Sequence, residues 1–272
     1  MTAAVVDTTL GELLSPSQVN TFLSCPAKWY FHYGLGLVEP ATGTLALGTA
    51  FHSALAANFR QKIETKQDLP AQELEESFGE AFAMAAEKAE FREDEEPAAL
   101  IETGRALVRR YIADAAPSVQ PQAVELPVEG IIAGVRVQGI VDLLDTEGRI
   151  IDFKTAARRP AGITPDYRLQ LTTYSMITRG AGGSCRLDTV TKTKTVQLVQ
   201  QNCEIGPEER RYAETLYPMA QEAMRDGIYP APQQPGLFPS VLRVLARMRE
   251  GIRRTSRRVN AFGQFALFRA LA

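Results

Sequence analysis

Acidic and basic side chains interrupt an otherwise apolar segment, GRIIDFKT, at residues 148–155. Side chains alternate between the two faces of a β-strand, so Asp152 and Lys154 point to one face while Ile151 and Phe153 point to the other. We expect Ile151 and Phe153 to anchor a hydrophobic core. The carboxylate and the ammonium on the opposite face then need solvent, an ion pair or a role in catalysis.

The residues just before this segment supply a second carboxylate. Residues 146–148 predict a three-residue hairpin loop, because glycine at the third position suits a left-handed backbone conformation. With that loop, the numbers of opposing residues sum to 294, so Asp142 lies opposite Asp152 on the same face. A two-residue loop would make the sum 293 or 295 and would put the two aspartates on opposite faces.

Two carboxylates this close together repel each other unless a cation or a proton lies between them. Oxygen ligands favour hard cations, so Mg²⁺ or Mn²⁺ is the expected occupant. A lysine at the same edge can position a water molecule or neutralise charge that builds on a phosphate. This arrangement is typical of phosphodiester hydrolysis. The alternative is a surface hairpin that carries only an ion pair between Asp152 and Lys154.

The surrounding sequence predicts the elements that position these residues. Ser15, Pro16 and Ser17 are typical of a helix start, and Gly48 is expected to open a second helix. Further helices are predicted at 71–88, 97–115, 166–178 and 207–226, and strands at 122–128, 134–144, 149–154 and near 187–200. This order of elements predicts an α/β fold with a mixed β-sheet flanked by helices.

Composition narrows the class of protein. The chain has 272 residues, 45% of them hydrophobic, and a formal net charge of −2, so bulk charge does not predict a nucleic-acid partner. Its three cysteines, Cys25, Cys185 and Cys203, lie far apart in sequence and do not predict a disulfide framework. We therefore expect a reduced, cytoplasmic setting. The N-terminal residues lack a signal-peptide pattern, and the most apolar window, 45–59, is too short to span a bilayer.

Four segments in order resemble the motifs of the PD-(D/E)XK nuclease superfamily, in its RecB-type branch. They lie at 14–33, 47–55, 139–155 and 166–177, and the resemblance extends over residues 14–200. That branch includes RecB and AddB nuclease domains, CRISPR adaptation exonucleases and phage exonucleases. The resemblance implies a restriction-endonuclease-like mixed sheet core flanked by helices, with a helical N-terminal region.

The resemblance also implies a metal site formed by His52, Asp142, Asp152 and the backbone carbonyl of Phe153, which would hold Mg²⁺ or Mn²⁺. It implies that Lys154 activates the attacking water. A simpler interpretation exists for His52, which lies among apolar residues at helical spacing and could be a partly buried core histidine.

Gln170 and Tyr174 match the QxxxY signature of the branch, in which the pair supports the site and the DNA phosphate. Residues four apart lie on one helical face, so the spacing agrees with this role, although an ordinary polar pair has the same spacing. Glu125, on the strand before the hairpin, is a further candidate carboxylate. His32 fits no motif, and we interpret it as structural.

Many members of the branch hold an iron–sulfur cluster through one cysteine near the N-terminus and three near the C-terminus. Cys25 matches the position of the first of these. The chain has no cysteine after Cys203. Because thiolates are the ligands that such clusters need, we expect no iron–sulfur cluster.

The predicted domain organisation is an N-terminal tail at 1–13, a single nuclease domain at 14–235 and a basic helical tail at 236–272. The domain would comprise a helical part at 14–120, a catalytic α/β core at 121–205 and a helix at 206–227. From Leu237 onward there are eight arginines and one acidic residue, Glu250. The tail is either a basic helix that follows the DNA backbone or a solvated helix that packs its apolar stripe where a cluster lobe would lie.

The leading hypothesis is a metal-dependent DNA exonuclease that acts on single strands or duplex ends, in DNA repair and recombination, phage replication or CRISPR adaptation. The alternatives are a catalytically weak or inactive DNA-binding or assembly module with the same fold, and an acidic interaction protein. DNA is the expected partner, and no membrane partner is expected. The sequence has no Walker-type glycine loop, so a helicase, like any other recombination or CRISPR protein, would be a separate partner.

Overall fold

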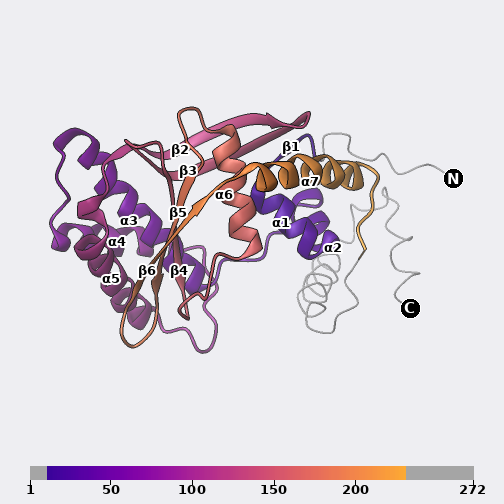
Figure 1. The fold of residues 1–272 in the computed structure, drawn as a ribbon. Helices are drawn as coiled ribbons and strands as arrows, with labels where there is room; N and C mark the ends of the chain where they lie inside the picture. The colour runs from indigo at the N-terminus through magenta and orange to yellow at the C-terminus, as the bar shows by residue number, and fades with distance from the viewer. Residues whose placement is uncertain (1–10, 231–272) are drawn as a thin grey trace. The chain divides into compact units, whose positions relative to one another are not determined.

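The computed structural model describes residues 11–230 (Figure 1). The predicted basic tail at 236–272 and nearly all of the predicted N-terminal tail lie outside this range. Within it, the chain divides into two compact units: a smaller one with residues 11–12, 18–39 and 219–230, and a larger one with residues 13–17 and 40–218. No helix within residues 11–230 combines the length and the apolar character needed to cross a membrane.

The smaller unit is built from short helical segments and an aromatic cluster. Its elements are α1 (Pro16–Ser24), which begins in the larger unit, α2 (Pro26–Trp29), a π-helical turn (Tyr30–Gly34) and the end of α7 (Pro207–Arg225). The ring of Tyr229 stacks on Tyr30 with centroids 4.5 Å apart and lies 5.7 Å from the Trp29 ring. These ring contacts join the segment that follows α7 to α2 and the π-helical turn within this unit.

Cys25 has a local role in this unit. It is the N-cap of α2, and its Sγ accepts a hydrogen bond from the backbone N–H of Lys28 at 3.3 Å. The cysteine that matches a cluster ligand in the family motif therefore caps a helix. The absence of an iron–sulfur cluster stays a prediction.

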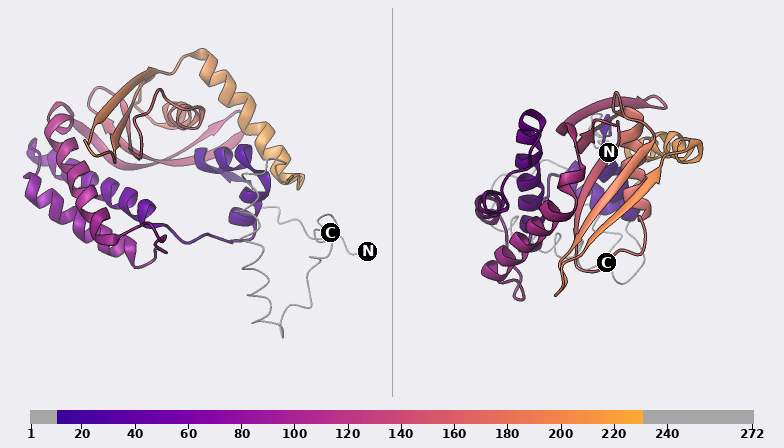
Figure 2. Two further views of the ribbon diagram at one scale, coloured as in Figure 1. Left: turned by 90° about the horizontal axis from the view of Figure 1, so that it is seen from below. Right: turned by 60° about the vertical axis from the view of Figure 1, so that its left-hand side comes forward.

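The larger unit places three helices on one face of its sheet: α3 (Gly43–Thr65), α4 (Ala71–Ala86) and α5 (Pro97–Asp114). Helix α6 (Pro165–Ile177) covers the other face (Figure 2). The three-helix face has an aromatic core in which Tyr111 lies edge-on to Phe51, Phe59 and Phe153. This core packs directly against the strand that carries Asp152 and Lys154.

Helix α3 begins earlier than the sequence predicted. We expected it to open at Gly48, but it starts at Gly43. The carboxylate of Glu95 accepts hydrogen bonds from the backbone N–H groups of Gly43, at 3.0 Å, and Thr44, at 2.9 Å. A bond from the backbone of Arg92, followed by those from Thr44, lowers the pKa of Glu95 to about 2. The N-cap itself is local, since the hydroxyl of Thr42 accepts the backbone N–H of Leu45 at 3.2 Å. Glu95 lies about fifty positions away, so the local sequence does not reveal its contribution.

The sheet is mixed and has six strands. They are β1 (Leu13–Leu14), β2 (Pro121–Ile132), β3 (Val135–Asp145), β4 (Ile150–Ala156), β5 (Ser184–Thr191) and β6 (Leu198–Glu204). The order is β1-β3-β4-β5-β6, with β2 also paired to β3. β4 and β5 are parallel and are joined through α6, whereas β2–β3, β3–β4 and β5–β6 are antiparallel. The predicted mixed sheet flanked by helices is confirmed.

One predicted strand was wrong. The segment near 187–200 forms the end of β5, a turn and the start of β6 instead of a single strand. In the turn, the hydroxyls of Thr191 and Thr193 lie 2.8 Å apart, and Thr193 Oγ1 donates to the carbonyl of Thr195 at 2.7 Å. Alternating threonine and lysine resembles a strand, but threonine hydroxyls that bond the nearby backbone favour a turn.

The β5–β6 hairpin brings two cysteines together. Cys185 lies directly opposite Cys203 in the register, both are buried free thiols, and the Cys185 thiol donates to the carbonyl of Leu171 at 3.9 Å. Their wide separation in sequence concealed this pairing across the two strands.

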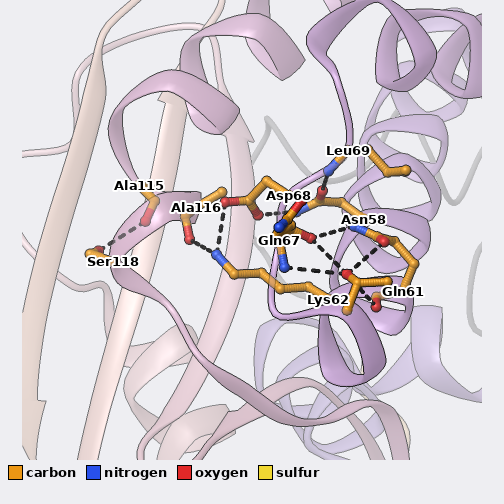
Figure 3. Close-up of polar contacts among 10 residues, drawn as sticks. Asn58, Gln61, Lys62, Gln67, Asp68, Leu69, Ala115, Ala116 and Ser118 are labelled. Carbon is orange, nitrogen blue, oxygen red and sulfur yellow. Dashed lines mark hydrogen bonds and ion pairs between the residues drawn. The ribbon is translucent and has the colours of Figure 1, made fainter.

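A buried lysine anchors the end of α3 (Figure 3). Lys62 Nζ donates to Asp68 Oδ2 at 2.8 Å and to the carbonyl of Ala116 at 2.7 Å. Asn58 Nδ2 donates to the other oxygen of Asp68 at 2.8 Å, and Asn58 Oδ1 accepts from the backbone N–H of Leu69 at 2.7 Å. These bonds connect α3 to the loop before α4 and to the turn after α5.

Replacing Lys62 with alanine should lower the free energy of unfolding by about 2–4 kcal/mol, because it removes a buried ammonium, its alkyl chain and a partner of Asp68. Urea unfolding followed by circular dichroism measures this difference. Lys88→Ala, at an exposed position, is the matched control and should change the free energy by less than about 0.5 kcal/mol. Equal stability of the two variants would contradict the anchoring role.

Candidate active site

The hairpin between β3 and β4 has the predicted loop. Leu143 pairs with Ile151 and Leu144 pairs with Ile150, and the residue numbers in both pairs sum to 294. Gly148 has a φ of +77°, the left-handed conformation expected of the third loop residue. The three-residue loop and its register are therefore confirmed.

Asp142 on β3 and Asp152 on β4 come next after the Leu143–Ile151 pair, on the side away from the loop. At this point, the backbone N–H of Phe153 donates to Asp142 Oδ2 at 2.8 Å, so a side chain takes the place of a backbone acceptor from β3. The negative charge of Asp142 also raises the pKa of Asp152, which reflects their proximity. The register thus brings Asp142 and Asp152 together, as the sequence predicted.

Helix α3 brings His52 to the first aspartate. His52 Nδ1 lies 3.4 Å from Asp142 Oδ2, and the imidazole ring is edge-on to Phe153 with centroids 6.1 Å apart. Burial alone would lower the pKa of His52, but the hydrogen bond and the charge of Asp142 outweigh burial and raise it. The same interaction outweighs burial at Asp142 and lowers the pKa of that carboxyl. His52 and Asp142 therefore favour an imidazolium–carboxylate pair.

The second aspartate is almost completely buried, with 2% of its surface exposed. Lys154 Nζ lies 2.5 Å from Asp152 Oδ2, and Gln170 Nε2 donates to Asp152 Oδ1 at 2.9 Å. Burial raises the pKa of Asp152 to about 6, although the charge of Lys154 opposes the shift. Burial of Lys154 would by itself lower the pKa of its ammonium group, but the negative charges of Asp152 and Asp142 outweigh burial and raise this pKa.

A divalent cation fits this arrangement. The Lys154 ammonium is the one partner of Asp152 Oδ2 among the described residues, and this buried oxygen has no further hydrogen-bond donor there. Such an oxygen beside a second carboxylate suits a hard cation. Within residues 11–230, however, no three histidine, cysteine, aspartate or glutamate side chains are arranged as a metal site. The ligand set of His52, Asp142, Asp152 and the Phe153 carbonyl stays a prediction.

Helix α6 supplies the amide that holds Asp152. Gln170 also donates to the hydroxyl of Tyr174, one turn later, at 3.4 Å. On the same helix, the Tyr167 ring lies beneath Lys154, with Nζ 5.1 Å from the ring centroid. The predicted pair of Gln170 and Tyr174 therefore lies next to Asp152, and Tyr167 is an additional neighbour that the motif did not identify.

Gly139 is a second residue that the motif did not identify. A Cβ atom at this position of β3 would lie 2.3 Å from Cε1 of Tyr174, so only glycine lets the ring pack against the strand. A glycine inside a strand often marks such a close approach, and this signal was available from the sequence.

The two remaining candidates have other neighbours. Glu125 forms an ion pair with Arg60 of α3 and has a φ of +46°, a strained conformation. It lies opposite Asp142 in the β2–β3 register, at a point where these two residues are not themselves paired. His32 lies in the smaller unit, where its ring is 4.4 Å from that of Tyr33. A role of Glu125 in metal binding stays untested.

The model of the PD-(D/E)XK nuclease superfamily matches residues 13–259, so the chain belongs to this superfamily, as its motifs predicted. A crystal structure of a candidate exonuclease from Eubacterium rectale is similar, with 13% identity, a TM-score of 0.54, and coverage of 86% of this chain and 91% of that one. A crystal structure of SSO0001 aligns at 14% identity over 74% of this chain and 86% of that one, with a TM-score of 0.31, too low to support an inference. A search of curated proteins gave no match.

Replacing Gly139 with alanine should destabilise the protein by about 1–3 kcal/mol, because the added methyl group overlaps the Tyr174 ring. Chemical unfolding measures the change. Gly162→Ala is the control, since a Cβ atom there meets nothing within 4 Å. A neutral or stabilising effect of Gly139→Ala would show that the ring does not depend on this glycine.

Proposed function

We propose that this chain is a divalent-metal-dependent deoxyribonuclease that acts as an exonuclease on single strands or duplex ends. One observation carries the proposal: Asp142, Asp152 and Lys154 converge at the end of the β3–β4 hairpin, in a member of a nuclease superfamily. Buried carboxylates beside a lysine suit phosphodiester hydrolysis better than a solvated ion pair does, because their burial is costly unless charge is balanced there.

Asp142, Asp152 and the carbonyl of Phe153 would hold the cation, with His52 as a nitrogen ligand. When bound, a divalent cation polarises a phosphoryl oxygen and lowers the pKa of a bound water molecule. Gln170 fixes Oδ1 of Asp152, and the cation would compete with the Lys154 ammonium, 2.5 Å away, for Oδ2. His52 must give up its proton to become a ligand.

Lys154 is protonated as long as the carboxylates carry their charge, because they raise its pKa. In this form it stabilises negative charge on the phosphate and orients the attacking water. A cation held by the carboxylates would weaken their effect on the pKa of Lys154, and the unprotonated amine could then accept a proton from the attacking water.

The alternative function is a DNA-binding or assembly module with weak or no cleavage. The observation that favours it is that the two carboxylates already have protein partners, His52 and Lys154. For the active enzyme, the biological setting would be DNA repair or recombination, phage replication or CRISPR adaptation in the cytoplasm, together with a separate helicase.

Replacing Lys154 with alanine should reduce Mn²⁺-dependent degradation of end-labelled DNA about 100-fold or more and leave DNA affinity largely unchanged. Lys194→Ala, at an exposed position in the β5–β6 turn, is the control and should retain activity. Single-stranded, duplex and circular DNA are compared, since an exonuclease spares circles. Undiminished cleavage by the Lys154 variant would rule out its proposed role, and cleavage of circles would rule out a strict exonuclease.

Mn²⁺ binding should weaken at least about tenfold for each pH unit below 6, because protons compete with the cation for Asp152, whose pKa is about 6, and for His52, whose pKa is raised by Asp142 against burial. Above pH 6 this carboxylate is ionised and the dependence on its proton disappears. Titration calorimetry or Mn²⁺ paramagnetic resonance between pH 5 and 8 measures the affinity. Asp152→Asn should bind weakly at every pH. A constant affinity of the unmodified protein from pH 5 to 7 would exclude Asp152 as a ligand.

A further inference from the structure

A cavity of about 600 Å³ lies beside the proposed cleavage site, within the larger unit. Its walls come from the chain between β1 and the first turn of α1, from facing parts of β2 and β3, and from Tyr174 of α6. This volume falls in the range of sites that hold one small organic group.

Tyr174 connects the cavity to the carboxylates. Its ring forms part of the cavity wall and packs on Gly139, while its hydroxyl accepts a hydrogen bond from Gln170. Gln170 in turn donates to Asp152. Only two contacts therefore separate the cavity wall from the proposed metal ligand.

The lining does not suit a phosphate group. No lysine or arginine is among the residues that line it, and the carboxylate of Glu129 is paired with the guanidinium of Arg136 at 2.6 Å. The wall instead combines the apolar surfaces of Pro127, Val128 and Ile140 with the amide of Gln138. Flat apolar faces with polar groups at the edge are what a nucleobase needs, since its faces stack and its edge forms hydrogen bonds.

We infer that this cavity holds one unpaired nucleobase of the DNA strand, next to the phosphodiester bond that is cleaved. The inference rests on the proposed function and specifies its substrate: the base must leave its partner strand to enter, so the enzyme acts on single-stranded or frayed ends. The phosphates on either side of that base would lie outside the cavity, and one of them would reach Lys154.

The test moves a single abasic residue through a fluorescently labelled single-stranded oligonucleotide and measures affinity by anisotropy, in chelator and again with Ca²⁺. At one position the abasic residue should weaken binding about tenfold, the loss expected for one stacked base. Ile140 lines the cavity and is 57% exposed, so a tryptophan at this position can occupy the cavity without disturbing the core. Ile140→Trp should therefore weaken binding of the intact strand by the same factor. In this variant the abasic residue should cause no further loss.

Ile131→Trp is the matched control, since Ile131 belongs to the same β2–β3 hairpin, is 72% exposed and does not line the cavity. It should bind like the unmodified protein. An abasic residue without a position-specific effect, or an equal effect in Ile140→Trp and the unmodified protein, would overturn the inference. Because these are binding measurements, a protein that shows the effect but cleaves no DNA would contradict only the proposed nuclease activity.

Discussion

The site depends on a carboxylate, that of Asp142, which takes the place of a backbone hydrogen-bond acceptor between two strands. At the point where β3 and β4 stop pairing, Asp142 accepts the backbone N–H of Phe153. This bond joins β4 to β3 beyond their last backbone pair and keeps the carboxylate of Asp142 beside the buried carboxylate of Asp152. Burial of two like charges is unfavourable unless opposite charges or protons compensate. The imidazole from α3 and the ammonium from β4 provide that compensation, and a cation would provide more.

The hydrophobic core and the site share one strand. On one side of β4, Phe153 is stacked on Phe59 with ring centroids 5.9 Å apart and meets the edge of Tyr111. On the other side, Asp152 receives its hydrogen bond from α6. Tyr111 also donates to Asp188 of β5 at 2.8 Å, so the same ring is fixed from the neighbouring strand. Packing on one face therefore sets the backbone position from which the carboxylate on the other face projects.

The sequence was sufficient to predict those features of the site that depend only on neighbouring residues in the chain. Gly148 sets the loop type, the loop sets the register, and the register brings Asp142 to Asp152. The true start of α3 was missed although Thr42 is a local N-cap, and the second contribution to the cap, from Glu95, comes from a distant loop. The superfamily motifs identified His52 and Gln170 as candidate site residues, and the structure places both beside the aspartates. A Cβ clash such as that of Gly139 becomes quantitative only when the partner ring is in place.

The parallel pairing of β4 with β5 has a consequence for the order of folding. A hairpin such as β3–β4 closes quickly because its strands are neighbours in sequence, whereas a parallel pair requires the whole α6 crossover to be in place first. The two aspartates can therefore meet early, before Gln170 and His52 arrive from elements far away in the chain. The hairpin alone would carry two close negative charges with Lys154 as their one local counter-charge, and docking of α3 and α6 would add the imidazole of His52 and the amide of Gln170.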